Sequence, residues 1–279
     1  MLVVALCIAL WTCPSARGEP GQPDPAEGPA TGPNGNEQYM LELVNRERIL
    51  AGVQPLSWNT QLARAARAHC AWMIAHQTFS HDENGASLID QLNRGGLVWR
   101  AGPYEFQQNI AWGNVLKSIP DEILRHHVGY LASPDHRVAL LNAAHQEVGI
   151  GLVEGQFRGM AALLTTENFG SNNATPFLTG AAYADSNGNG RYDPGEGRPQ
   201  VEVRIRDRDG RTRSVSTADG GGYSVNLAPG TYRVSLSTEQ PSAAPRVVRI
   251  DRANVKLDFV EPAGGSGEKR DDRTSRNDH

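Results

Sequence analysis

Apolar residues in the first half of the chain recur mainly at the spacing of three to four residues that is typical of an amphipathic helix. A first helix is predicted from Asn36, as its N-cap, to about Ala51. A second helix is predicted from its cap at Asn59 to about His76. The apolar face of this second helix consists of Leu62, Ala65, Ala66, His69, Cys70 and Met73.

Further along, helical and strand patterns alternate. Ser118-Ile119-Pro120-Asp121 fits a capping box and predicts a third helix that ends near Ala132. Residues 148–152 and 161–169 are predicted to be strands. Helices intermixed with strands predict an α+β fold in which helices pack in layers against a sheet.

After Asn173 the apolar spacing changes to every second residue. Turn sequences such as Asp209-Gly210 and Pro229-Gly230 separate the alternating runs. Residues 173–262 are therefore predicted to form a small all-β antiparallel sandwich. The alternating apolar positions are Val201, Val203 and Ile205; Tyr223, Val225 and Leu227; Tyr232, Val234 and Leu236; and Val255, Leu257 and Phe259.

The two ends of the sequence lack the pattern of a folded core. The apolar run at 2–11 is too short to span a bilayer and precedes Ala16-Arg17-Gly18, so residues 1–18 are predicted to be a secretory signal peptide. A short membrane anchor is the alternative. Residues 19–36, rich in Pro and Gly, are predicted to be a linker, and the polar residues 263–279 a disordered tail. No transmembrane segment is expected in the mature chain.

Charge and cysteine content exclude some classes of protein. The net charge of −4 and the pI of about 6.1 give no basic footprint for nucleic acid. Removal of residues 1–18 would leave Cys70 as the only one of three cysteines, so no internal disulfide is expected. Cys70 lies on the apolar face of the second predicted helix and is expected to be buried rather than reactive.

The segment from Asp185 to Glu196 matches the pattern of a calcium-binding loop at every fixed position. Gly190 stands where the loop needs a sharp turn. A polar turn without metal is the alternative. The predicted Ca²⁺ ligands are Asp185, Asn187, Asn189, Arg191 through its carbonyl oxygen, Asp193 and Glu196.

Residues 179–237 around this loop resemble the calcium-binding B-type modules of bacterial serine-aspartate-repeat adhesins. Asp219-Gly220-Gly221-Gly222-Tyr223 and Leu227-Ala228-Pro229-Gly230-Thr231-Tyr232 match later strands and turns of those modules. The resemblance implies that the C-terminal part is a rigid extracellular spacer.

Five segments within residues 37–172 resemble, in order, the CAP superfamily of cysteine-rich secretory, antigen-five and pathogenesis-related proteins. They are Leu43-Val44-Asn45-Arg46-Glu47-Arg48, Leu56-Ser57-Trp58-Asn59, Phe79-Ser80-His81, Gln108-Asn109-Ile110-Ala111-Trp112-Gly113, and Ser133-Pro134-Asp135-His136-Arg137 with the following 148–151 segment. The resemblance is to the bacterial type and implies a three-layer α–β–α sandwich. Its cleft would hold two histidines and two acidic residues.

The two histidines of that cleft match His81 and His136, whereas its acidic residues are replaced by Gln108 and Ser133. Two imidazoles can bind Zn²⁺ weakly, but a catalytic zinc site normally has three protein ligands. Glutamine cannot accept a proton as a general base. The pattern thus favours a ligand-binding cleft, with a weak Zn²⁺ site as a further possibility.

Together these features predict a secreted, non-catalytic extracellular or cell-surface protein. Its cleft would bind a small extracellular ligand, a lipid or a cell-wall component. Its calcium-stabilised β-sandwich would act as a spacer. One alternative is a metal-assisted hydrolase or peptidase that uses His81 and His136. Another is a lipid- or sterol-binding protein.

Overall fold

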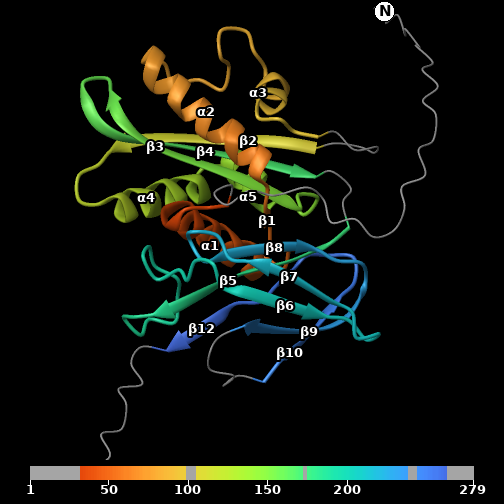
Figure 1. The fold of residues 1–279 in the computed structure, drawn as a ribbon. Helices are drawn as coiled ribbons and strands as arrows, with labels where there is room; N and C mark the ends of the chain where they lie inside the picture. Colours follow the sequence, from red (N-terminus) through yellow and green to blue (C-terminus); the bar gives the residue numbers. More distant parts are fainter. Residues whose placement is uncertain (1–31, 99–104, 172–174, 238–243, 263–279) are drawn as a thin grey trace, which may run out of the picture.

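The computed structural model describes residues 32–98, 105–171, 175–237 and 244–262. The predicted signal peptide, residues 19–31 of the predicted linker and the predicted tail lie outside the described residues, whereas the last linker residues, from the cap at Asn34 onward, belong to the first helix. Within the described part, an N-terminal sandwich of helices and strands covers residues 32–171, and a C-terminal β-unit covers residues 175–262 (Figure 1).

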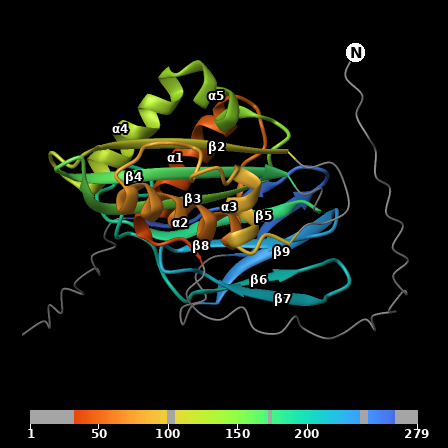
Figure 2. The ribbon, with the colours of Figure 1, turned by 90° about the horizontal axis from the view of Figure 1, so that it is seen from above.

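The N-terminal sandwich is built on a four-stranded sheet of order β1-β3-β4-β2. Helix α2 packs on one face, with α3 beside it, and α1, α4 and α5 pack on the other, which gives the expected three-layer α–β–α arrangement. Figure 2 shows α2 overlying β3 and β4. The elements are α1 (Gly35–Leu50), β1 (Ser57–Trp58), α2 (Thr60–His76), α3 (Leu88–Arg94), β2 (Glu105–Asn114), α4 (Ile119–Ala132), α5 (Pro134–Leu141), β3 (Glu147–Phe157) and β4 (Met160–Ser171).

The helix caps follow the sequence signals with one correction. Asn59 caps α2 and Ser118 caps α4, as predicted. The first helix is capped by Asn34 and not by Asn36, because Asn34 and Glu37 form a complete capping box. The Asn34 Oδ1 atom accepts from the backbone N–H groups of Asn36 and Glu37, each at 3.0 Å.

Strand alternation supplies both helix layers with apolar partners. On β4, Leu163 and Phe169 pack against α1, α4 and α5, whereas Leu164 belongs to the cluster that includes Cys70 and Met73 of α2. Glycines of β3 allow α2 to approach closely. A Cβ atom on Gly149 would lie 1.9 Å from the backbone nitrogen of Ala63, so any side chain there would push the layers apart.

The C-terminal β-unit consists of β5 (Phe177–Asp185), β6 (Glu202–Arg206), β7 (Thr212–Ser216), β8 (Gly222–Asn226), β9 (Gly230–Ser237), β10 (Arg246–Ile250), β11 (Val255–Lys256) and β12 (Phe259–Pro262). One sheet has the order β10-β9-β6-β7, and β8, β11 and β12 all pair with β5. The prediction of an antiparallel sandwich needs a correction, because β11 and β12 pair with β5 in parallel. The sheets enclose one apolar cluster that includes Val203, Val234 and Ile250.

Buried polar contacts join the C-terminal β-unit to the N-terminal sandwich. The Asn254 side chain is 4% exposed and donates to the carbonyl oxygens of Pro55 at 2.9 Å and Gln146 at 2.7 Å. Ser57 of β1 is hydrogen-bonded through its hydroxyl to Ser224 of β8. Because such groups are buried only when they are paired, the two units form a specific interface.

Candidate functional site

His81 and Gln108 lie in contact, as their proposed place in one cleft requires. Gln108 is on β2, and His81 is in the loop between α2 and α3. The Nδ1 atom of His81 lies 2.8 Å from the Gln108 Oε1 atom. A carbonyl oxygen can only accept, so Nδ1 carries the proton and Nε2 is the atom that the neutral ring can offer to a ligand.

The amide of Gln108 is held by other amides and not by charged groups. Its Nε2 atom donates to Gln91 Oε1 at 2.9 Å and to Asn168 Oδ1 at 3.0 Å. Gln91, on α3, also donates to the His81 carbonyl oxygen at 2.7 Å. Neither α3 nor the role of Gln91 was predicted from the sequence. The capping box formed by Ser87 and Asp90 is the signal that could have revealed this helix.

His136 and Ser133, the second predicted pair of the cleft, lie in contact at the start of α5. The Nδ1 atom of His136 lies 2.8 Å from the Ser133 Oγ atom, and the Tyr130 ring lies 5.3 Å from the His136 ring, centroid to centroid. Partial burial lowers the pKa of His136, and the charge of His81 lowers it further. This favours the neutral form of the His136 imidazole, which is the form that binds metals.

The acidic residues near His81 in sequence are engaged elsewhere. The carboxylate of Glu83 contacts His69 Nδ1 at 2.7 Å and also pairs with Arg94. Asp82 accepts from the backbone N–H of Gly85 at 2.7 Å. Over the described residues, no three His, Cys, Asp or Glu side chains gather as a metal group.

Glu167, on β4, is a buried carboxyl group close to this cleft that sequence reasoning did not assign to it. Asn109 links the two, since its Nδ2 atom donates to Glu167 Oε2 at 3.2 Å and to the His136 carbonyl oxygen at 3.1 Å. The Glu167 Oε1 atom is buried without a hydrogen-bond partner. Burial raises the pKa of Glu167 to about 8, so this group is mainly protonated at neutral pH.

The possible nucleophiles are poorly equipped for covalent chemistry. Ser133 is hydrogen-bonded to His136, but no carboxylate of the described residues is hydrogen-bonded to the His136 ring. A serine nucleophile normally needs such an orienting acid. Cys70 is fully buried, as expected, and burial raises the pKa of its thiol to about 12.

The predicted calcium loop lies between β5 and β6 and folds back on its own backbone. Asp185 accepts from the N–H groups of Asn189 at 3.0 Å and Gly190 at 2.9 Å. Glu196 accepts from the N–H groups of Ser186 at 2.8 Å and Asp193 at 3.0 Å. Gly190 has a φ of 72°, the left-handed conformation expected for its turn.

The oxygen donors of this loop are of the kind that a hard cation such as Ca²⁺ prefers, but its carboxylates, Asp185, Asp193 and Glu196, do not gather as a ready-made metal group in the described part of the structure. Asp185 and Glu196 are each 7% exposed. No ion pair of the described residues involves either of them or Asp193. The side-chain amides of Asn187 and Asn189 donate to Asp193 at 2.8 and 2.6 Å. These amides would have to turn for their oxygens to join the carboxylates around a cation, while Arg191 would contribute its carbonyl oxygen.

Comparison with known proteins identifies the N-terminal sandwich. Residues 41–169 match the CAP family, described as the cysteine-rich secretory protein family. This part of the chain is a CAP domain of bacterial type, as the order of sequence segments predicted.

Two curated proteins of Bacillus subtilis (strain 168) are similar to this domain. An uncharacterized membrane protein, YlbC, is 32% identical over 121 residues, which cover 42% of this chain and 31% of YlbC. An uncharacterized protein, YkwD, is 29% identical over 119 residues, which cover 42% of each chain. This chain therefore matches less than half the length of either relative.

Solved structures are similar over the same part of the chain. An extracellular protein with an SCP domain from Bacillus anthracis is 28% identical with a TM-score of 0.38, and the match covers 48% of this chain and 40% of that one. An outer surface protein of Borrelia burgdorferi is 16% identical with a TM-score of 0.39, over 49% of this chain and 92% of that one. Among the described residues, no helix is long and apolar enough to cross a membrane.

Proposed function

We propose that this protein is an extracellular, non-catalytic CAP-domain protein whose cleft around His81 and His136 binds a small ligand, a lipid or a cell-wall component. The observation that carries the proposal is the contact between His81 Nδ1 and Gln108 Oε1 at 2.8 Å. Acid–base catalysis would need a general base at the position of Gln108. The side-chain amide of glutamine cannot take up a proton in that role. The surrounding Gln91 and Asn168 amides supply hydrogen bonds but no base.

The C-terminal β-unit serves, in this proposal, as a spacer that calcium stabilises. The acidic loop from Asp185 to Glu196 supports this role through its oxygen donors and its lack of basic partners. Extracellular calcium modules typically have dissociation constants of about 10⁻⁴–10⁻³ M, which suits calcium levels outside cells. We infer the extracellular location from the sequence of residues 1–18 and from similar proteins that are described as extracellular or outer-surface proteins.

Zinc titration and activity assays on the full chain test the role of the cleft. Calorimetry should detect at most weak Zn²⁺ binding, and the double change His81→Ala/His136→Ala should abolish it. Gln108→Glu should strengthen it, because a carboxylate adds a third ligand beside His81. His76→Ala, an exposed histidine outside the cleft, is the matched control.

The competing function is a metal-assisted hydrolase or peptidase that uses His81 and His136. The observation in its favour is that hydrogen bonds at Nδ1 orient both imidazoles, at 2.8 Å in each case, and leave each Nε2 atom for a metal. Hydrolysis of a casein-derived peptide mixture and of p-nitrophenyl acetate, with and without zinc, distinguishes the two functions. We expect no turnover that depends on His81 and His136. Turnover that disappears in the double histidine variant but persists in His76→Ala would overturn the non-catalytic assignment.

A further inference from the structure

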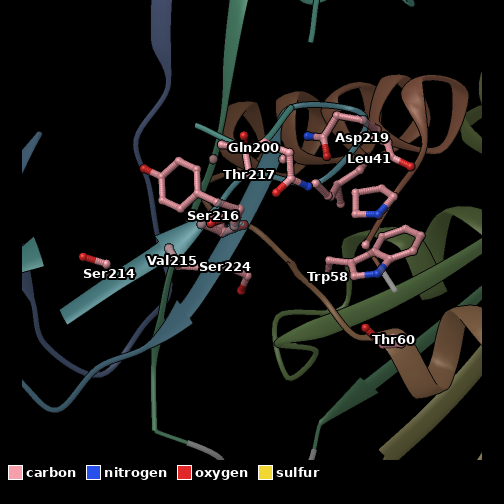
Figure 3. Close-up of a pocket in the computed structure, with 18 residues that line it drawn as sticks. Leu41, Trp58, Thr60, Gln200, Ser214, Val215, Ser216, Thr217, Asp219 and Ser224 are labelled. Atoms are coloured by element: carbon pink, nitrogen blue, oxygen red, sulfur yellow. Dashed lines mark hydrogen bonds between the residues drawn. The ribbon is translucent and has the colours of Figure 1, made fainter. Parts of the chain in front are cut away.

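A cavity of about 460 Å³ lies between the CAP domain and the C-terminal β-unit, away from the His81–His136 cleft. The CAP side of the wall comes from α1, β1 and the start of α2, and the other side comes mainly from β5, β7 and β8. Figure 3 shows Trp58 and Thr60 on one side of the cavity and Ser214 and Ser216 on the other. The complete wall exists only when both units are present. The volume of the cavity falls in the range of about 300–1,000 Å³ that is usual for small-molecule sites.

The chemistry of the wall favours a neutral, hydroxyl-bearing ligand. Its polar members are mainly serine and threonine hydroxyls and the amides of Gln38 and Gln200. Asp219 is the only charged residue among the described residues of the wall, and Lys and Arg are missing from it. An anionic ligand would thus find no cation in this wall. The Trp58 indole and the Tyr223 ring supply apolar surface beside these polar groups.

Gln38, which lines the cavity, has a hydrogen-bond acceptor that none of the described residues satisfies. Its side chain is 1% exposed, and its Nε2 atom donates to Glu42 Oε1 at 2.7 Å. The Gln38 Oε1 atom is buried and has no hydrogen-bond partner among the residues that the structure describes. Leaving a buried acceptor without a hydrogen bond is unfavourable, because the atom has lost its contacts with water. A donor on a bound molecule would remove this cost.

The opposite wall is held in a fixed conformation. Gln200 has a φ of 59°, which is unusual for a residue other than glycine, and its backbone N–H donates to the Thr217 carbonyl oxygen at 3.0 Å. The Thr217 hydroxyl in turn donates to the Arg198 carbonyl oxygen and accepts from the Val201 N–H at 2.9 Å. Non-glycine residues in strained conformations occur preferentially at binding sites.

We infer that the cavity between the two units binds a neutral saccharide of one or two rings. A sugar ring presents hydroxyl donors and acceptors around its edge and apolar C–H groups on its faces. It can therefore pair with the Gln38 oxygen, the Gln200 amide and the Ser216 hydroxyl while its apolar face covers the Trp58 indole. This site is distinct from the ligand cleft of the proposed function and does not depend on it.

Isothermal titration of the full chain with maltose, cellobiose and N,N′-diacetylchitobiose tests this assignment. At least one disaccharide should bind to the unaltered chain. Ser216→Trp should weaken that binding at least tenfold by filling the cavity. Thr212→Trp is the matched control, because Thr212 is exposed on the same strand, β7, but does not line the cavity. Circular dichroism melts should confirm that both variants remain folded.

Two further variants distinguish binding in this cavity from binding in the His81–His136 cleft. Gln38→Met should weaken saccharide binding at least tenfold, since it removes the Oε1 acceptor. It also removes the Nε2 donor to Glu42, so a circular dichroism melt must show that the chain remains folded. His81→Ala/His136→Ala should leave saccharide binding unchanged. The inference is overturned if none of the three sugars binds, if Ser216→Trp and Thr212→Trp bind equally well, or if only the double histidine variant loses binding.

Discussion

The ammonium group of Lys256 lies 2.8 Å from the carboxylate of Glu42, so β11 of the C-terminal β-unit forms an ion pair with α1 of the CAP domain. The two side chains are only 10% and 14% exposed, and Asp258 also contacts Lys256. Burial lowers the pKa of Lys256, but the two carboxylates outweigh this effect and raise it. The lysine is therefore charged at neutral pH and neutralises two partly buried acids.

Lys256→Met should destabilise the whole chain because it leaves Glu42 and Asp258 without their cation. Removing one partner of a buried ion pair costs about 3–5 kcal/mol. Urea unfolding, followed by circular dichroism, measures this loss. Arg211→Met is the control, since the pair of Arg211 with Asp209 is exposed and such pairs contribute about 0–1 kcal/mol. A loss for Lys256→Met as small as that of the control would show that the ion pair does not hold the units together.

Calcium should raise the melting temperature of the full chain relative to a chelator. If the ion binds only the folded state, the gain is about 1.4 kcal/mol at ten times the dissociation constant. Asp185→Ala and Glu196→Ala should each abolish the calcium-dependent shift, whereas Asp209→Ala, at an exposed acid outside the loop, should preserve it. Equal melting temperatures in millimolar calcium and in chelator would mean that the loop is only a turn.

Acid should destabilise the CAP domain through its buried histidines. Burial lowers the pKa values of His126, His127 and His145 to about 4, from 6.5 for an unperturbed histidine. Because the unfolded chain binds these protons more readily, stability should fall as the pH drops below about 6.5 and continue to fall until about 4. Urea unfolding between pH 7 and pH 4.5 measures this slope.

The contribution of His127 to this loss of stability in acid can be tested with a single substitution. Both ring nitrogens of His127 are buried without partners, so His127→Phe should reduce the pH slope and raise stability at pH 5. His76→Gln alters an exposed histidine and should leave the slope unchanged. If His127→Phe kept the full slope, protonation of this residue would not contribute to acid unfolding.

Glu167→Gln should stabilise the protein at alkaline pH. The pKa of Glu167 is about 8 in the folded chain and 4.5 when unperturbed, so the contribution of this group to stability is complete below about 4.5 and falls as the pH rises from 4.5 through 8. An amide is neutral at every pH, so the variant should gain on the order of 1–3 kcal/mol at pH 9. Glu154→Gln on β3, an exposed position, should show no such gain. Thermal melts at pH 5 and pH 9 measure the effect, and destabilisation by Glu167→Gln at both pH values would contradict a buried, protonated carboxyl group.

The sequence predicted elements whose signals are local. Helix α2 has a cap at Asn59 and an uninterrupted apolar face, and both appear in the structure. Strand β2 was not predicted because Gln107, Gln108 and Asn109 interrupt any simple alternation of apolar residues. The alternation of apolar and polar residues could not predict strand direction either, because it is the same in parallel and antiparallel strands. The parallel pairing of β12 with β5 follows from the path of the chain between them.

The cleft was predictable only where the family resemblance supplied the residues. His81 and Gln108 are 27 positions apart, and nothing local in the sequence states that they touch. The partners of Gln108 come from α3 and β4, so their roles depend on tertiary packing. Glu167 looks like an ordinary charged strand residue, and its raised pKa arises from complete burial.

Asn254 makes the boundary between the two units difficult to cut or recombine. Besides its two bonds to CAP carbonyl oxygens, it accepts at Oδ1 from the Phe177 N–H and donates its own N–H to the Gln54 side chain. A CAP domain joined to a different C-terminal partner would keep the Pro55 and Gln146 carbonyl groups but lose the side chain that satisfies them. Shuffling of these units by gene fusion would thus succeed only with a partner that brings an equivalent amide, so they should be inherited as a matched pair.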